Sequence, residues 1–162
     1  MIKATIKDID KLYAIIEECS EWLQSKGVPQ WNPIYPKKLF FKNVEEGNVF
    51  YFKNNNELIG TATLFTKKPF YYPEEIWNDK TKVWYLCRFA VPRNLKDKKV
   101  GEKIINEIEN KAKQLGVEWI RMDVVKANPF LEGYYSRLGY NRVNEVLLHK
   151  TQSILMEKRI EK

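Results

Sequence analysis

The sequence has 162 residues, enough for one domain with a sizeable hydrophobic core and too few to leave much room for a second. It is 44% hydrophobic, contains no run of about 18 apolar residues and begins without the apolar middle of a signal peptide, so we expect a soluble, cytoplasmic protein. The net charge of +7 arises from 28 basic and 21 acidic residues mixed along the chain, which allows an anionic partner without identifying one. Cys19, Cys87 and a single histidine argue against a disulfide framework or a zinc site.

The first third of the chain predicts two helices. Apolar residues recur at helical spacing between Leu12 and Leu23, with Asp8 as an N-cap and Gly27 as the stop. This pattern predicts an amphipathic helix. Prolines interrupt the following loop, after which "KKLFFKNVEEG" predicts a shorter second helix.

A β-hairpin and an irregular segment come next. Residues 49–65 predict two strands around an Asn-rich turn. Residues 66–80, "TKKPFYYPEEIWNDK", contain two prolines, four aromatic residues and three acids. We expect this segment to leave the sheet as an ordered excursion, because its aromatic content is too high for a disordered linker.

The second half predicts a strand, a turn, a helix and another strand. Residues 82–91 form the first strand-like run, and Val100 to Leu115 repeat apolar residues at helical spacing up to Gly116. Residues 118–125 then resume as a strand, and such a crossover favours a parallel pair within the sheet. The remaining sequence predicts a short helix and a closing hairpin.

The turn between that strand and that helix is strongly basic. It carries Arg93, Lys96, Lys98 and Lys99 against the single acid Asp97. A helix start leaves backbone N–H groups unpaired in front of the positive end of the helix dipole, which makes a binding site for anions. Several cations around that site suit a ligand with several phosphates, whereas the alternative is a solvated, charged turn without a ligand.

Two stretches, "FAVPRNLKDKKVGEKI" and "NPFLEGYYSRLGY", resemble the GNAT superfamily of acyl-CoA-dependent N-acetyltransferases, and the resemblance spans most of the chain. The family's hexapeptide, Q/R-x-x-G-x-G/A, is occupied in register by Lys96, Asp97, Lys98, Lys99, Val100 and Gly101. Its later signature, Asn with Tyr seven residues on and then Leu-Gly-Phe, is matched by Asn128, Tyr135, Leu138, Gly139 and Tyr140.

The resemblance implies one α/β or α+β domain over residues 1–162, with a twisted, mixed and mostly antiparallel sheet of about six or seven strands flanked by helices. It also implies an acyltransferase that moves an acetyl group from acetyl-CoA to a primary amine of a small molecule or peptide, without a metal. The sequence departs from the family hexapeptide at two positions in the turn that would hold the pyrophosphate of CoA. Lys96 stands where Arg or Gln is usual, and Lys99 stands where the first glycine is usual.

The resemblance also assigns roles to individual residues. The backbone of Phe89, Ala90 and Val91 corresponds to the splayed strand that holds the pantetheine arm and polarises the thioester. Tyr135 corresponds to the general acid that protonates the CoA sulfur. Its neighbour Tyr134 would point about 100° away on a helix. Asn128 corresponds to a partner for the pantetheine amides, a helix cap, or both.

The sequence assigns no general base, because residues 82–91 contain no carboxylate. Asp123 lies on the next strand, and Glu74, Glu75 and Asp79 lie in the excursion, where they could attract a cationic acceptor. Five aromatic residues could line an acceptor site: Trp22, Trp31, Trp77, Tyr71 and Tyr72. Each of them fits a core position better.

A second class of function stays open at this point. The chain could be a basic α/β module that binds CoA or nucleic acid without catalysis, if the altered glycine and the missing base mean that the chemistry has been lost. We favour the enzyme and expect neither a nucleic acid nor a membrane as a partner. The sequence leaves open whether the chain forms a homodimer and which acceptor it uses.

Overall fold

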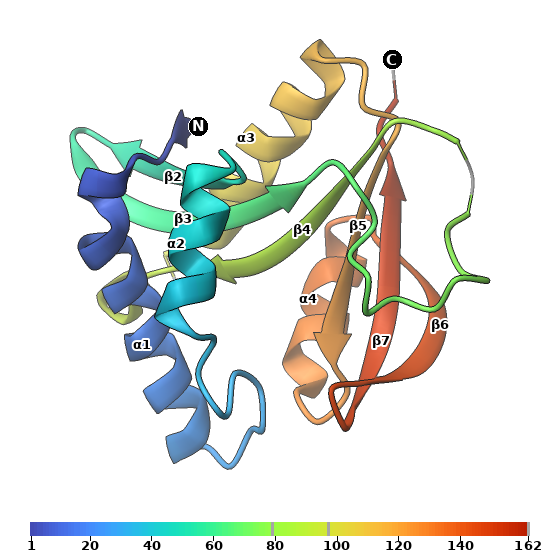
Figure 1. Ribbon diagram of the computed structural model, residues 1–162, viewed down its shortest axis with the longest axis horizontal. Coiled ribbons are helices and arrows are strands. Elements are labelled where there is room, and N and C mark those ends of the chain that lie inside the picture. The colour runs from blue at the N-terminus through green and yellow to red at the C-terminus, as the bar shows by residue number, and fades with distance from the viewer. Residues whose placement is uncertain (79, 97, 162) are drawn as a thin grey trace. The chain divides into compact units, whose positions relative to one another are not determined.

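The computed structural model describes residues 1–78, 80–96 and 98–161 (Figure 1). Within these described residues, seven strands form a mixed, mostly antiparallel sheet in the order β1-β2-β3-β4-β5-β7-β6. Their bounds are Ile2–Lys3 (β1), Val49–Asn54 (β2), Glu57–Phe65 (β3), Val83–Ala90 (β4), Trp119–Val125 (β5), Asn141–Leu148 (β6) and Thr151–Arg159 (β7). The pair β4–β5 is parallel, as the crossover predicts, and the pairs β1–β2, β2–β3, β5–β7 and β6–β7 are antiparallel. The predicted fold class is confirmed.

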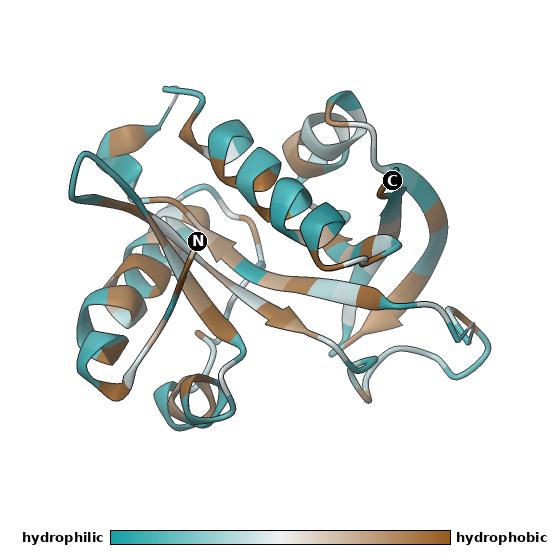
Figure 2. Ribbon diagram, turned by 90° about the horizontal axis from the view of Figure 1, so that it is seen from above, coloured by the Kyte–Doolittle hydropathy of each residue, from teal (hydrophilic) through white to brown (hydrophobic). Residues whose placement is uncertain are grey.

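In the part of the chain that the structure describes, four α-helices and two short 3-10 helices accompany the strands. The α-helices are Ile9–Ser25 (α1), Lys37–Glu45 (α2), Val100–Gln114 (α3) and Pro129–Arg137 (α4), and the 3-10 helices are Ile6–Asp8 (η1) and Arg93–Leu95 (η2). Each α-helix falls on a segment that the sequence predicts to be helical. The hydropathy colouring in Figure 2 shows hydrophilic and hydrophobic bands along the helices, as amphipathic helices require.

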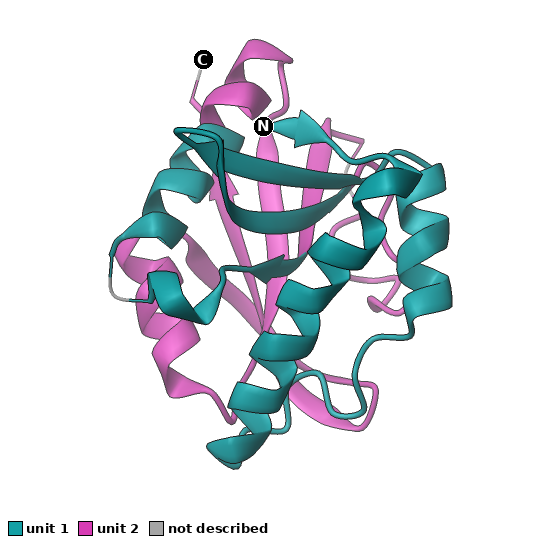
Figure 3. Ribbon diagram, turned by 90° about the vertical axis from the view of Figure 1, so that its left-hand side faces the viewer, with its two compact units in different colours: residues 1–64, 88–108 teal, residues 65–87, 109–162 magenta. Residues whose placement is uncertain are grey.

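The chain divides into two compact units, coloured separately in Figure 3. Unit 1 contains residues 1–64 and 88–108, and unit 2 contains residues 65–87 and 109–162. Strand β4 and helix α3 each contribute residues to both units.

The core of unit 1 is built from α1, α2 and the hairpin strands. The predicted stripe of α1 is confirmed, since Leu12 and Ile16 are fully buried and Cys19 and Leu23 are each 7% exposed. From α2, Phe40 packs against this stripe with its ring centroid 5.7 Å from that of Tyr13. Asp8 occupies the N-cap position of α1, as predicted.

Both predicted hairpins form, and their turns show how the sequence specifies them. Asn55 and Asn56 link β2 to β3 with φ values of +47° and +66°, and asparagine tolerates this left-handed region better than most residues. In unit 2, His149 and Lys150 link β6 to β7 with φ values of +47° and +66°. Histidine and lysine are not typical turn residues, so the sequence gives no turn signal here. The pairing register of β6 and β7 is therefore set by the strands.

One predicted core position is wrong. Ile104, Ile108 and Ala112 of α3 are fully buried, as their spacing predicts, but Leu115 is 46% exposed. The helix ends at Gln114, and the N–H of Val117 donates to the C=O of Ala112, so the chain reverses before Leu115 can join the buried stripe.

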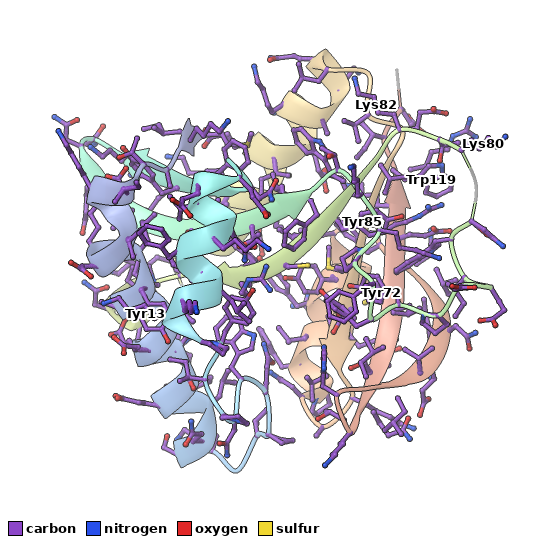
Figure 4. The ribbon with its side chains drawn as sticks, in the orientation of Figure 1. Tyr13, Tyr72, Lys80, Lys82, Tyr85 and Trp119 are labelled. Carbon is purple, nitrogen blue, oxygen red and sulfur yellow. The ribbon has the colours of Figure 1, made fainter. Side chains whose placement is uncertain are left out.

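The core of unit 2 contains the aromatic excursion. Tyr72 and Trp77 are 3% and 9% exposed, and their rings meet edge-on at 5.2 Å. Tyr72 also lies 6.0 Å from Tyr85 of β4, and Figure 4 labels this pair of tyrosines. The ammonium of Lys68 donates to the carbonyls of Pro73, Glu74 and Ile76, so the excursion is ordered without helix or strand.

Candidate functional site

Strand β4 changes character along its length. Its parallel register with β5 covers Val83 to Tyr85, opposite Trp119 to Arg121. Further along, Arg88 has φ of +46°, outside the extended range, which reorients the backbone groups beside it. The predicted site residues Phe89, Ala90 and Val91 follow this departure at the end of the strand.

A glycine allows the end of β4 to lie close to its neighbours in unit 1. A Cβ atom on Gly60 of β3 would lie 2.9 Å from the carbonyl oxygen of Ala90 and 2.6 Å from Cδ1 of Ile104. Real Cβ atoms do not approach backbone oxygens so closely, so only glycine fits here. Gly60 is not among the predicted site residues, and its only signal in the sequence is an isolated glycine inside a strand pattern.

The hexapeptide covers the start of α3. Lys99 has φ of +55°, the left-handed conformation that glycine adopts without cost and that other residues adopt at about 1 kcal/mol. Its C=O accepts the N–H of Lys103 at 3.2 Å, so the first helical hydrogen bond begins at Lys99. Lys96, Lys98 and Lys99 are exposed, while Val100 and Gly101 are half-buried in the first turn; Asp97 lies outside the described residues.

Arg93 and Lys96 are anchored by an aromatic side chain of α1. The guanidinium carbon of Arg93 lies 3.7 Å from the ring centroid of Trp22, and the ammonium of Lys96 lies 5.8 Å from the same centroid. Cations over an indole face are attracted by its quadrupole. Trp22 therefore supports the basic turn, whereas its sequence position predicted a core residue or part of an acceptor site.

Tyr135 of α4 is buried, with 6% of its surface exposed. Burial raises the pKa of its phenol well above the usual value, and the neighbouring Tyr134 and Asp123 raise the pKa further. The hydroxyl therefore keeps its proton at neutral pH. Tyr134 is half-buried and stacks on the exposed Phe130 at 5.8 Å.

The Leu-Gly-Tyr sequence after Tyr135 ends the helix. Gly139 has φ of +87°, its N–H donates to the C=O of Ser136, and the N–H of Tyr140 donates to the C=O of Tyr135. These bonds form a Schellman motif, which needs a residue that accepts positive φ. At the other end, Asn128 occupies the N-cap position and Pro129 is the first helical residue.

The remaining candidates are placed as follows. The carboxylate of Asp123 accepts a hydrogen bond of 2.6 Å from the phenol of Tyr72, while Glu74 and Glu75 are exposed. Trp31 is half-buried, and its C=O accepts the hydroxyl of Ser20. Asp79 lies outside the described residues.

The predicted site residues fall into two groups. Phe89, Ala90, Val91 and the described hexapeptide residues lie in unit 1, on one continuous strand, turn and helix start. Asn128 and Tyr135 lie in unit 2, at the start and in the last turn of α4. Among the described residues, no three or more His, Cys, Asp or Glu side chains gather as a metal ion would require.

The family model described as "Acetyltransferase (GNAT) family" matches residues 11–140. The chain belongs to the GNAT acetyltransferase family. A comparison with curated proteins found no match. The GNAT assignment thus rests on the family model, and solved GNAT structures bear on the fold.

Several solved structures share this GNAT fold. A GNAT-family acetyltransferase from Streptococcus agalactiae superposes with a TM-score of 0.85 at 17% identity, covering 99% of this chain and 94% of that one. One from Listeria monocytogenes gives 0.80 at 22% identity, covering 96% and 91%. The PaiA N-acetyltransferase from Thermoplasma acidophilum, solved in complex with coenzyme A, gives 0.69 at 18% identity, covering 97% and 96%.

None of the described helices of this GNAT protein is both long enough and apolar enough to cross a membrane.

Proposed function

We propose that the protein is an N-acetyltransferase that moves the acetyl group of acetyl-CoA directly to a primary amine of a small molecule or peptide, through one domain spanning residues 1–162. The observation that carries this proposal is the left-handed turn at Lys99, which opens α3 inside the GNAT hexapeptide. The conformation that the family's glycine would supply is present here on a lysine.

The turn and the helix start fit a diphosphate. The first N–H groups of α3 have no partner within the helix, and the helix dipole places partial positive charge there. The exposed cations Lys96, Lys98 and Lys99 surround this end of α3. We assign Asp97, Val100 and Gly101 to the same cradle, because backbone groups rather than side chains would contact the phosphates.

The backbone of Phe89, Ala90 and Val91 would hold the pantetheine arm and polarise the thioester carbonyl, with Asn128 as a second partner for the arm. The departure from extended geometry at Arg88, immediately before these residues, supports this role. Polarised carbonyls are stabilised by fixed donors, which act strongly where water is excluded.

Tyr135 would supply the proton for the leaving group. As the neutral acceptor nitrogen bonds to the acetyl carbon, the carbon–sulfur bond breaks, the nitrogen gives its surplus proton to water, and the departing thiolate takes a proton from the phenol. The raised pKa of Tyr135 keeps the phenol protonated when the amine attacks, but it also makes the phenol a weaker acid, so the proton would pass only to a strongly basic departing thiolate. Water would return a proton to the phenolate.

The acceptor amine must be neutral when it attacks, and a free alkylamine has a pKa of about 10. Exposed Glu74 and Glu75 would attract its cationic form, which then loses a proton to water or to a group still to be identified. We leave the base unassigned, since Asp123 already accepts the Tyr72 phenol.

One observation favours a second candidate, a module that binds CoA without catalysis. Strand β4 has no carboxylate along Val83–Ala90, so it supplies no base for the amine. The two candidates differ in whether a thiol is released.

A screen with a thiol reporter separates them. The protein is incubated with acetyl-CoA and a panel of amines and peptides with free N-termini, and thiol release is followed with and without each amine. If the protein is an acetyltransferase, release of the CoA thiol should depend on the amine. Binding of CoA without amine-dependent release across the panel would favour the binding module.

A further inference from the structure

The connection that leaves β4 is held by three contacts to α1. The C=O of Val91 accepts a hydrogen bond from the thiol of Cys19 at 3.3 Å. The N–H of Arg93 donates to the carboxylate of Glu18 at 3.1 Å, and the guanidinium of Arg93 lies on Trp22. We refer to Glu18, Cys19 and Trp22 together as the α1 clamp.

The clamp takes up the polar backbone groups on both sides of a proline. Pro92 has no N–H, so the Val91 C=O and the Arg93 N–H are the hydrogen-bonding groups that flank it where the strand ends. Glu18 and Trp22 are four residues apart and share a helix face, which lets both reach Arg93. Burial raises the pKa of Cys19 to about 11, so its thiol stays protonated and can donate.

The clamped residues stand between the two parts of the proposed CoA site. Val91 directly follows β4 and is the last of the three residues proposed to hold the pantetheine arm. Arg93 is the first residue of η2, which ends at Leu95, a residue that is 8% exposed. The hexapeptide begins immediately after η2, at Lys96. A shift at Pro92 would therefore move the end of the strand and the start of the hexapeptide apart or together.

We propose that the α1 clamp positions the acetyl-CoA site, so that Glu18, Cys19 and Trp22 act as positioning residues that set CoA affinity without touching the reacting atoms. This inference rests on the proposed function. It also gives Arg93 a supporting role in the basic turn, because both its N–H and its guanidinium are engaged by α1. The exposed lysines are left as the cations that meet phosphate.

A purely structural role for these contacts would have a different signature. Loss of a structural contact lowers the melting temperature but leaves the dissociation constant for CoA unchanged in the molecules that remain folded. Loss of a positioning contact raises that constant and the KM for acetyl-CoA, while the KM for the amine stays the same.

The test uses pairs of variants in the full-length protein. Glu18→Ala removes the acceptor for the Arg93 N–H, whereas Glu18→Gln retains an amide oxygen that can accept it. Cys19→Ala removes the donor to Val91, whereas Cys19→Ser retains one. Glu21→Ala is the control, since Glu21 is an exposed acid on the same helix. The dissociation constant for CoA is measured by calorimetry, well below the melting temperature of each variant.

Both alanine variants in the clamp should bind CoA about threefold to tenfold more weakly, which is the net effect of losing one hydrogen bond. Glu18→Gln, Cys19→Ser and Glu21→Ala should bind it nearly as the wild type does. The inference is overturned if the clamp variants bind CoA as tightly as the wild type, or if Glu21→Ala weakens binding equally. Absence of CoA binding by the wild type would instead overturn the proposed function, and this inference with it.

Discussion

The N–H of Tyr140 donates a 3.0 Å hydrogen bond to the C=O of Tyr135, and the rings of the two tyrosines meet edge-on at 5.7 Å. The Leu-Gly-Tyr sequence thus closes the last turn of the helix that carries the proposed acid. Gly139 permits the reversal, and Tyr140, which is 2% exposed, holds it in the core. We infer that this part of the GNAT signature positions Tyr135 and that the signature's chemistry resides in the phenol itself.

Tyr135→Phe should lower turnover by a factor of about 10² to 10⁴, the usual contribution of a general acid, because the change deletes the hydroxyl that would donate the proton. CoA affinity and the melting temperature should change little. Tyr134→Phe is the matched control and should be nearly silent. If Tyr134→Phe carries the loss, the predicted register is one residue out; if neither variant slows transfer, the acid is not a tyrosine of α4.

Reversing two charges of the basic turn should weaken the stabilisation by acetyl-CoA. A ligand that binds only the folded state raises the melting temperature by mass action, so the shift at a fixed acetyl-CoA concentration reports affinity. Lys96→Glu combined with Lys98→Glu should reduce this shift. Reversal of Lys111 and Lys113, in the last turn of α3, should leave the shift unchanged. If acetyl-CoA raised the melting temperature of both double variants equally, the basic turn would not be part of the CoA site.

The acidic pair in the excursion bears on the acceptor. Glu74→Gln with Glu75→Gln should raise the KM for a cationic amine more than the KM for acetyl-CoA, because only the amine is attracted by the lost charge. The effect should shrink at high salt, since both residues are exposed. Steady-state kinetics with each substrate varied in turn decide this, and equal changes in both KM values would exclude the segment from acceptor binding.

Gly60→Ala should lower the free energy of unfolding by about 1–3 kcal/mol, because the added methyl group would collide with Ala90 and Ile104. Gly133→Ala is the counterpart. The nearest atom to a Cβ there is 3.8 Å away, and alanine in a helix is favoured over glycine by about 0.5–1 kcal/mol. Urea unfolding measures both, and a destabilised Gly133→Ala together with a neutral Gly60→Ala would contradict the described packing.

The sequence predicts much of this molecule where local patterns determine structure. The buried stripe of α1, the Asn55–Asn56 turn and the crossover through α3 follow from periodicity, turn chemistry and chain direction. Contacts between distant segments do not. The Glu18–Arg93 hydrogen bond joins residues 75 positions apart, and no local pattern in either segment indicates it. The positive φ of Lys99 could not be predicted from the residue itself, because lysine gives no signal for that conformation.

Low pH should lower the free energy of unfolding, in part because Asp8 becomes protonated. Hydrogen bonds from Lys11, which are the main cause, and from Thr5 together lower the pKa of this carboxyl from 3.8 to about 2. A lowered folded-state pKa stabilises the protein above the unfolded-state value, and that stabilisation is lost as the pH falls from about 4 towards 2. Asp8→Asn should be less stable than the wild type at pH 6 in urea unfolding. The difference should narrow below pH 4, whereas a constant difference would exclude this ion pair as its source.

If the acetyl group passes directly from acetyl-CoA to an amine, free CoA and acetylated amine must form in a one-to-one ratio. The enzyme is incubated with acetyl-CoA and an accepted amine, free CoA thiol is quantified with a thiol reporter, and the acetylated amine is quantified by mass spectrometry. We predict equal amounts of the two products at every time point, with both rates reduced in Tyr135→Phe. Thiol released without a matching amount of acetylated amine would show that the acetyl group does not pass directly to the amine.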